Sequence, residues 1–272
     1  MTAIDRWREQ LERWAIPAEI TSAAPESPYG FPTELFRMRG RHATGAADPT
    51  PTTVRALEGL PDGGRVLDVG CGGGATSLPL AGRAGVLVGV DSQEDMLEGF
   101  LSNARAAGVN AEVVPGRWPN VADRVGPADV AVVGHVLYNV ANLEPFARSL
   151  AAVARRRVVF ELTDRHPLRW MNDLWLRFHG LERPEGPTAQ DALDALTELG
   201  LDPVIERWAG PPAAGGFERK DDAVALVRRR LCLPPNRDGE LTDALGSRLE
   251  KREGLWSTGP PNQELATIRL GR

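Results

Sequence analysis

A short apolar run that ends in an aspartate and a cluster of glycines constrains the fold of this chain most strongly. In RVLDVGCGGG, residues 65–74, the apolar positions predict a buried strand, and the glycines predict a tight turn whose backbone another molecule can approach closely. We expect a helix over residues 75–83 to follow. A strand, a G-x-G turn and a helix in this order are typical of nucleotide-binding α/β proteins. The turn is not a P-loop, because no G-K-[ST] follows it.

Strand and helix patterns alternate along the rest of the chain. Apolar runs predict further strands at residues 85–91, 111–116, 128–137, 156–163, 202–210 and 263–270. Helical periodicity predicts helices at residues 51–59, 92–108, 142–154 and 187–200, with two more between the last two strands. We expect Ser92 to cap the helix over 92–108, and Thr188 and Gly200 to bound the helix between them. The alternation indicates an α/β fold with a doubly wound, mostly parallel sheet of seven strands.

The segments outside this alternation predict two additions to the sheet. Ile4, Trp7, Leu11 and Trp14 form one helical stripe, and residues 1–50 are interpreted as an N-terminal helical cap segment to a main domain of residues 51–272. An irregular insert at about residues 164–186 follows the fifth strand. We expect most aromatic residues of the two additions to pack between cap and sheet, and some to wall a ligand pocket. These residues are Tyr29, Phe31, Phe36, His166, Trp170, Trp175 and His179.

Composition and charge argue against several classes of protein. The 272 residues carry a net charge of −5, which disfavours non-specific nucleic-acid binding through a broad basic face. The arginine runs 155–157 and 228–230 are interpreted as solvated ends of a strand or helix. Cys71 and Cys232 form neither a disulfide framework nor a zinc-ligand pattern. The amino-terminal residues lack an apolar signal region, and no apolar run approaches the ~20 residues that span a bilayer. We therefore expect a cytoplasmic protein.

Two acidic residues indicate which ligand the glycine turn receives. Gly70, Gly72 and Ala75 satisfy the dinucleotide fingerprint G-x-G-x-x-G/A, so this pattern alone admits a pyrophosphate. Asp68, two residues before the first glycine, would repel a pyrophosphate but suits a ligand with an ammonium group. S-adenosylmethionine has an α-ammonium, a sulfonium and no phosphate. Asp91 ends the second strand, where a carboxylate can accept hydrogen bonds from ribose hydroxyls. In the alternative interpretation, Asp68 is a structural cap of the loop.

The segments VLDVGCGGG and VGVDSQEDML together resemble the class I S-adenosylmethionine-dependent methyltransferases. The family's motif D/E-x-G-x-G-x-G is matched by Asp68, Gly70, Gly72 and Gly74, and its acidic residue after strand two by Asp91. The resemblance implies S-adenosylmethionine as cofactor and the sheet order 3-2-1-4-5-7-6, with strand seven antiparallel. It also implies further cofactor-binding residues at the glycine loop, at the start of the next helix and at the end of strand four. These are Cys71, Ser92, Met96 and Gly134.

The sequence departs from the family after the third strand. Many members have an acidic residue there that receives the adenine amino group, whereas this chain has Gly116, Arg117 and Trp118. We expect Arg117 and Trp118 to line the adenine site, with Trp118 covering the face of the purine. One of the cap arginines, Arg37, Arg39 or Arg41, is a further candidate to pair with the cofactor carboxylate, although such arginines are more often surface residues.

The end of the fourth strand is expected to face the transferable methyl group. His135 lies there and is the candidate catalytic residue, either as a general base or as a residue that only positions the cofactor or the next loop. Tyr138 and Asn139 are weaker candidates. No metal is expected, because His166 and His179 have no accompanying ligand pattern.

The methyl acceptor is expected to be a small molecule. The [DNS]-P-P-[FY] motif of the amino-methylating nucleic-acid enzymes is missing at His135, and no cysteine is placed to attack a pyrimidine ring. Two alternatives stay open. The first is an RNA methyltransferase that uses the two arginine runs, and the second is a non-catalytic module that binds the cofactor or a partner. The oligomeric state is not fixed by the sequence.

Overall fold

A seven-stranded sheet forms the centre of the protein. The computed structural model describes residues 1–29, 48–210, 216–260 and 262–271. The strand order is β3-β2-β1-β4-β5-β9-β6, and β9 runs antiparallel to both of its neighbours. This order confirms the predicted α/β sheet, with β9 as the predicted seventh strand. The strands are β1 Gly64–Val69, β2 Ala84–Asp91, β3 Asn110–Pro115, β4 Ala128–Gly134, β5 Ala154–Thr163, β6 Val204–Ala209 and β9 Glu264–Leu270.

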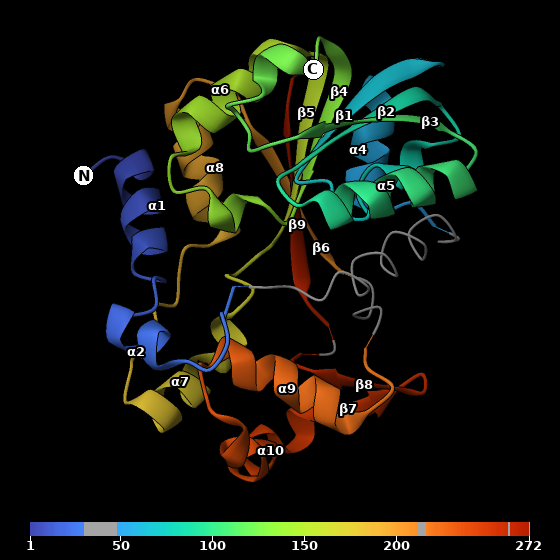
Figure 1. Ribbon diagram of the computed structural model, residues 1–272. Coiled ribbons are helices and arrows are strands. Elements are labelled where there is room, and N and C mark those ends of the chain that lie inside the picture. The colour runs from blue at the N-terminus through green and yellow to red at the C-terminus, as the bar shows by residue number, and fades with distance from the viewer. Residues whose placement is uncertain (30–47, 211–215, 261, 272) are drawn as a thin grey trace.

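Helices cover both faces of this sheet (Figure 1). Helices α4 (Pro51–Gly59) and α5 (Glu94–Ala106) lie on one face, and α6 (Leu143–Val153) and α8 (Ala189–Glu198) lie on the other. Alternate strand residues pack into two apolar cores, one on each face of the sheet. Val66 belongs to the core beneath α4 and α5, whereas Leu67 belongs to the core beneath α6 and α8. This period of two explains why continuous apolar runs form strands that are covered on both faces.

The predicted N-terminal helix is present and belongs to the helical layer. Helix α1 (Ala3–Glu12) begins at a capping box formed by Thr2 and Asp5 and packs against α8. Trp7 is fully buried, and its indole N–H donates to the Val140 carbonyl at 2.8 Å. Trp14 donates to the Gly186 carbonyl at 2.6 Å. The cap residues Phe31, Phe36, Arg37, Arg39 and Arg41 lie outside the described residues.

A second lobe packs beyond the carboxyl ends of the parallel strands. It contains α2 (Ala18–Ala23), α7 (Asn172–His179), α9 (Lys220–Arg230), α10 (Asp238–Leu245) and the hairpin of β7 (Leu249–Arg252) and β8 (Leu255–Thr258). Trp175 and Phe178 of α7 join Val227 of α9 and Leu241 of α10 in one apolar cluster. Trp175 is therefore buried, but in the core of the second lobe and not between the cap and the sheet as predicted. The sequence analysis did not predict the hairpin.

Three predicted local features are wrong. Residues 75–83 contain one 3-10 turn, Leu78–Leu80, instead of a helix, because Pro79 lacks the N–H that an interior helical position donates. The cap of α5 is Gln93 and not Ser92, and the Gln93 amide donates to the Asp91 carboxylate at 3.0 Å. Strand β4 ends at Gly134 and not at residue 137, because His135 takes a left-handed backbone conformation with φ of 58°.

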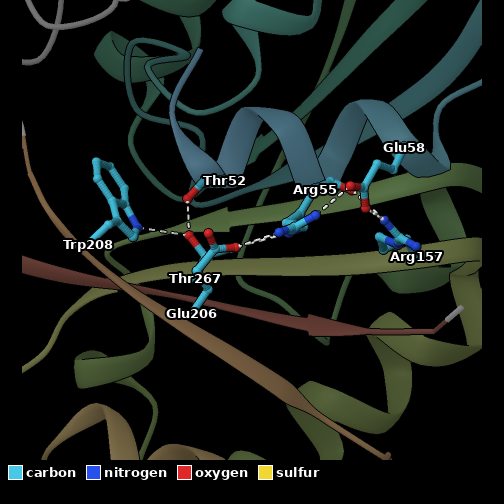
Figure 2. A network of polar contacts seen from close by, with 7 residues as sticks. All are labelled: Thr52, Arg55, Glu58, Arg157, Glu206, Trp208 and Thr267. Atoms are coloured by element: carbon cyan, nitrogen blue, oxygen red, sulfur yellow. Dashed lines mark hydrogen bonds and ion pairs between the residues drawn. The ribbon is translucent and has the colours of Figure 1, made fainter. Parts of the chain in front are cut away.

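The arginine runs are tied into the fold at two of their members. Arg157 of β5 is 7% exposed and donates to Glu58 of α4 at 2.6 Å and to the Arg55 carbonyl at 2.9 Å (Figure 2). Arg228 of α9 is 12% exposed at its side chain and pairs with Glu26 at 3.3 Å. The expectation that both runs are solvated ends is therefore wrong for Arg157 and Arg228, because each joins its element to a neighbouring segment of the chain.

Candidate active site

The glycine turn after β1 requires glycine at several positions. Gly70, Gly72 and Gly74 have φ angles of 70°, 48° and 85°, which L-residues with a side chain rarely adopt. A Cβ atom at Gly70 would lie 2.4 Å from Val136 Cγ2, so the turn also packs against the segment that follows β4. The loop is thereby held between the end of β1 and the segment that follows β4.

Asp91 connects this loop to the end of β2. Its Oδ2 accepts the Gly72 amide at 3.1 Å, and its Oδ1 accepts the Gln93 amide at 3.0 Å. Each carboxylate oxygen can accept two hydrogen bonds, so both retain capacity for a further donor. The site therefore fits the vicinal hydroxyls of a ribose.

Asp68 lies beneath the loop and not at its open side. The carboxylate is 1% exposed and accepts the Ser77 hydroxyl at 2.5 Å. Burial, together with the nearby charge of Asp91, raises the pKa of Asp68 to about 7. This geometry is that of an anchor for the loop, which the sequence analysis held as its alternative interpretation. The charge of Asp91 still favours a cationic ligand above the turn.

The remaining predicted cofactor residues differ in what they present. Cys71 is buried and packs its thiol against β2, so only its backbone belongs to the loop, and burial raises the pKa of the thiol. Met96 is buried, whereas Ser92 and Arg117 are exposed. Trp118 is 9% exposed and donates to the Phe146 carbonyl at 3.1 Å. The structure thus places the Trp118 indole in the core beside α6 and not openly over a purine, because the indole N–H finds its partner there.

Gly134 brings the end of β4 against the loop. A Cβ atom at this position would lie 2.0 Å from Thr76 Oγ1, in the turn that follows the glycines. The next residue, His135, is therefore set at the border of the cofactor loop. Sequence analysis did not predict the close approach of Gly134 to Thr76.

His135 pairs with a carboxylate that sequence analysis missed. Its Nε2 lies 3.2 Å from Oε1 of Glu161 in β5, and its backbone amide donates to the Glu161 carbonyl at 2.7 Å. The imidazole is 50% exposed, whereas the Glu161 side chain is 14% exposed. A left-handed backbone at a residue with a side chain costs free energy, and such strain is often found at functional sites. The one signal for Glu161 was an acidic residue within the apolar run VVFELT.

The ionisation of Glu161 is set by opposing effects. Burial alone would raise the pKa of this carboxyl, but hydrogen bonds from His135 and Thr52 and the charge of His135 outweigh burial and lower it. Glu161 is therefore an ionised hydrogen-bond acceptor that orients the imidazole.

Tyr138 and Asn139 do not share this arrangement. The Tyr138 hydroxyl donates to the Thr163 carbonyl at 2.7 Å, and burial raises the pKa of this phenol. Its ring stacks on Trp7 and meets the His166 ring edge-on at 5.1 Å. Asn139 is exposed. Tyr138 is thus a buried residue that supports His166 in the wall of the site.

A crevice of about 290 Å³ opens between the end of β5 and the start of β9. We call it the β5–β9 crevice. It is lined by Thr163, Asp164, Arg165, His166, Pro167, Arg169, Trp170, Pro260, Asn262, Gln263 and Glu264. The ring of Trp14 stacks on that of His166 at 3.7 Å, so the N-terminal segment supports this wall.

His166 is held in its neutral form within the crevice wall. Burial and the charge of Arg183 lower the pKa of this imidazole to about 3, and its Nδ1 accepts the Leu168 amide at 3.3 Å. His179 lies elsewhere, with its Nε2 2.6 Å from the Leu231 carbonyl. Among the residues that the structure describes, no three His, Cys, Asp or Glu side chains gather as a metal site.

Comparison with known proteins identifies the family. Residues 66–157, which hold the glycine loop, Asp91 and His135, match a family described as a methyltransferase domain. The chain is a class I S-adenosylmethionine-dependent methyltransferase. The methyltransferase is 28% identical over 197 residues to the ubiquinone biosynthesis O-methyltransferase of Rhizobium rhizogenes, over 65% of this chain and 77% of that relative. A protein with the same description from Azorhizobium caulinodans is 36% identical over 96 residues, or 35% of this chain and 36% of the relative.

Solved structures share the fold of the methyltransferase. The YcgJ protein of Bacillus subtilis gives a TM-score of 0.52 at 17% identity and covers 85% of this chain and 98% of its own. The magnesium protoporphyrin IX methyltransferase of Synechocystis, solved with S-adenosylhomocysteine, gives 0.51 at 15% identity, over 96% and 93% of the two chains. The likeness shows a common architecture. In the described ranges of the methyltransferase, no helix has the length and apolar character needed to cross a membrane.

Proposed function

We propose that this methyltransferase methylates a hydroxyl group of a small molecule and that His135 removes the hydroxyl proton. The observation that carries the proposal is the 3.2 Å contact between His135 Nε2 and Glu161 Oε1, beside the cofactor loop. A histidine paired with an ionised carboxylate is an effective general base near neutral pH. Oxygen as the methylated atom is supported by the O-methyltransferase names of the relatives from Rhizobium and Azorhizobium.

The described residues provide a fitting cradle for the cofactor. When bound, S-adenosylmethionine supplies an electrophilic methyl group on a positively charged sulfur. The glycine loop offers its backbone, Asp91 offers two acceptors for the ribose, and Gly134 keeps the end of β4 close to the loop. Asp68 and Ser77 hold the loop from beneath. These residues orient the cofactor, and His135 removes the proton of the acceptor hydroxyl.

The β5–β9 crevice is the proposed site for the acceptor. Ligands of open α/β sheets bind outside the carboxyl ends of the strands, where this crevice lies. Its volume of about 290 Å³ is at the lower end for ligand pockets, and most of its lining side chains are polar. The acceptor is therefore a compact, polar, hydroxylated molecule. The two cysteines are free and buried, which supports the expected cytoplasmic location.

The structure gives little support to an RNA acceptor. Binding RNA needs exposed cations that contact phosphates. Arg157 and Arg228, one from each arginine run, are instead engaged in ion pairs with carboxylates of the protein.

A panel of small phenols, catechols and hydroxy acids, assayed with methyl-labelled S-adenosylmethionine, tests the proposal. With the best acceptor, His135→Ala is expected to lower kcat by about 10²–10⁴-fold. Its affinity for S-adenosylhomocysteine, measured by calorimetry, should stay within about two-fold of the original. Asn139→Ala, an exposed change four residues away, is the matched control. Unchanged kcat in His135→Ala would refute the role of the base, and labelling of RNA but of no small molecule would refute the acceptor class.

A further inference from the structure

A buried histidine in the wall of the β5–β9 crevice has one ring nitrogen left for a ligand. His166 is 7% exposed and lines the crevice. Its Nδ1 accepts the Leu168 amide at 3.3 Å. A backbone amide can only donate, so Nδ1 must keep its lone pair, and the one hydrogen of the neutral imidazole is on Nε2. The ring therefore carries a hydrogen-bond donor at Nε2.

Protein contacts hold the other parts of the His166 ring. Trp14 stacks on it, with centroids 3.7 Å apart and planes inclined by 13°, and Tyr138 meets it edge-on at 5.1 Å. Neither Trp14 nor Tyr138 lines the crevice. Within the described ranges, Nε2 has no hydrogen-bond partner, yet it is not fully enclosed by protein. The Nε2–H group is therefore the part of the side chain that the crevice presents to a ligand.

This donor is fixed before any ligand binds. The ring cannot rotate without losing the stacking on Trp14 and the hydrogen bond from Leu168. Burial keeps the imidazole neutral, with a pKa of about 3, so the single hydrogen stays on Nε2 around neutral pH. A site built to donate a hydrogen bond discriminates against ligands that leave its donor unpaired.

The charges of the crevice do not favour one sign of ligand. Asp164 and Arg169 are each engaged in an ion pair with a residue outside the crevice. The other two charged lining residues, Arg165 and Glu264, are exposed and opposite in sign. The side-chain amides of the wall contain both donors and acceptors, so they do not select either kind of group. Discrimination in the crevice therefore falls to the fixed donor of His166.

We infer that His166 is a specificity-determining residue that donates its Nε2 hydrogen to a carbonyl or carboxylate oxygen of the methyl acceptor. Such an oxygen accepts without bringing a proton of its own, whereas a second hydroxyl would need a further partner for its proton. The acceptor is thus a small molecule with a hydroxyl group to be methylated and, apart from it, a carbonyl-type oxygen. The inference deepens the proposed function and rests on the proposal that the crevice holds the acceptor.

Tyr138 connects this donor to the proposed base. It follows His135 by three residues, its hydroxyl donates to the Thr163 carbonyl at 2.7 Å, and its ring contacts His166. Strands β4 and β5, which lead to the two histidines, are neighbours in the sheet. The donor and the base therefore lie along the same edge of the sheet, where one small acceptor can meet both.

Three phenols of similar shape test the inference on the original protein. The probe meta-hydroxybenzoate carries a carboxylate, meta-hydroxyacetophenone a neutral carbonyl, and meta-isopropylphenol neither. We expect one or both of the first two to bind more tightly than meta-isopropylphenol, by about three- to ten-fold, as for one hydrogen bond. Calorimetry with S-adenosylhomocysteine present gives each Kd without turnover. Arg165→Ala separates the two sources of oxygen, because it should weaken only the carboxylate probe.

Substitutions of His166 give the second readout. His166→Phe keeps a ring for Trp14 and removes the donor, so the preference for the carbonyl-type probes should disappear. The KM of a turned-over acceptor should rise by the same factor, with kcat within about two-fold, because the hydrogen bond is equal in ground and transition states. His166→Gln, which returns an N–H, should recover most of the preference. His179→Phe, which loses a contact with the Leu231 carbonyl elsewhere, is the matched control and should keep it.

The tautomer can be observed directly. The protein has four histidines, so ¹⁵N-histidine labelling and long-range ¹H–¹⁵N spectra resolve the ring nitrogens of each. We expect His166 as the Nε2–H form near neutral pH, assigned by the loss of its signals in His166→Gln. A carbonyl-type probe should shift the Nε2 signal, and meta-isopropylphenol should not. If His166→Phe does not fold, these spectra and the three probes carry the test.

The outcomes separate this inference from the proposed base. Equal affinity for the three probes, binding of none of them, or an unchanged preference in His166→Phe would overturn the inference, as would an Nδ1–H tautomer. A fully active His135→Ala would overturn the proposed base and leave the inference intact, because binding of the probes requires no proton removal.

Discussion

The amide of Gly72 donates to Oδ2 of Asp91 at 3.1 Å, so the cofactor loop after β1 is fastened to the end of β2. The same carboxylate is the proposed ribose acceptor. Loop shape and cofactor binding therefore depend on one side chain.

Replacing Asp91 with alanine should weaken cofactor binding strongly. The change removes both the loop contact and the acceptors for the ribose hydroxyls, and hydrogen bonds to a charged group contribute about 1.5–3 kcal/mol each. We expect at least a ten-fold rise in the Kd of S-adenosylhomocysteine by calorimetry. Asp95→Ala, an exposed change in the first turn of α5, should leave Kd unchanged. Binding of NAD by the original protein, without binding of the sulfur compound, would contradict the assignment.

Asp68 should make the stability of the methyltransferase depend on pH. Its pKa of about 7 in the folded state lies above the ordinary value of 3.8, so between these pH values the folded protein holds a proton that the unfolded chain has released. The free energy of unfolding therefore falls as pH rises through this window, by up to about 1.4 kcal/mol per pH unit from this group. Asp68→Asn should remove that part of the slope in urea titrations at pH 5 and pH 7. Equal slopes in the two proteins would show that Asp68 titrates normally.

Gly134→Ala should lower both the stability of the protein and its affinity for the cofactor, unlike a typical surface substitution. The added Cβ would overlap Thr76 Oγ1, at 2.0 Å, so β4 and the cofactor loop must move apart. Overpacking of this kind costs about 1–3 kcal/mol. We expect a lower melting temperature and weaker S-adenosylhomocysteine binding. Gly82→Ala, where a Cβ meets nothing within 4 Å, is the control. If Gly134→Ala behaves like Gly82→Ala, the loop is more adaptable than its contacts indicate.

Loss of Glu58 should lower the free energy of unfolding more than loss of its partner Arg157. Arg157 is 7% exposed, and Glu58→Ala leaves its charge buried without the carboxylate, at a cost of about 2 kcal/mol. Arg157→Met instead leaves Glu58, which is 41% exposed and can be solvated, and should cost less than about 1 kcal/mol. Urea denaturation of both variants measures the difference. Equal losses would mean that the pair behaves like an exposed one.

Two variants distinguish a structural role of the N-terminal segment from a functional one. Deleting residues 1–45 is expected to abolish methyl transfer. The fully buried indole of Trp7 predicts that Trp7→Ala alone costs about 3–5 kcal/mol of stability. A deletion variant that still folds and turns over the acceptor would contradict the predicted cap over the acceptor site.

The sheet was predictable from sequence because its central strands are apolar on both faces. Runs such as VLDV and VAVV leave no alternative to a buried strand, and the glycines mark where β1 must turn. The missed hairpin had a weaker signal. Its two-residue turn, Glu253 and Gly254, has φ angles of 47° and 86°, but glutamate is not one of the usual residues at the first of these positions.

The candidate site was only half predictable for a different reason. Asp68 and Asp91 lie in the last residues of β1 and β2, His135 directly follows β4, and all three are visible as a local pattern. Glu161 contributes through a contact between distant segments, and one acidic residue in an apolar stretch does not reveal its partner. The position of Asp68 in the motif likewise did not reveal that its carboxylate would accept a hydrogen bond from Ser77.

Strand β9 comes last among the seven strands of the sheet in sequence, yet it lies between β5 and β6. Strand β6 pairs with β9 on its one bonded side. During translation, the ribosome therefore delivers the entire glycine loop well before Glu264–Leu270, and β6 waits without a hydrogen-bonded neighbour until that final insertion. The residues that carry the glycine loop, Asp91 and His135 are therefore synthesised well before the strand that joins β6 to the rest of the sheet.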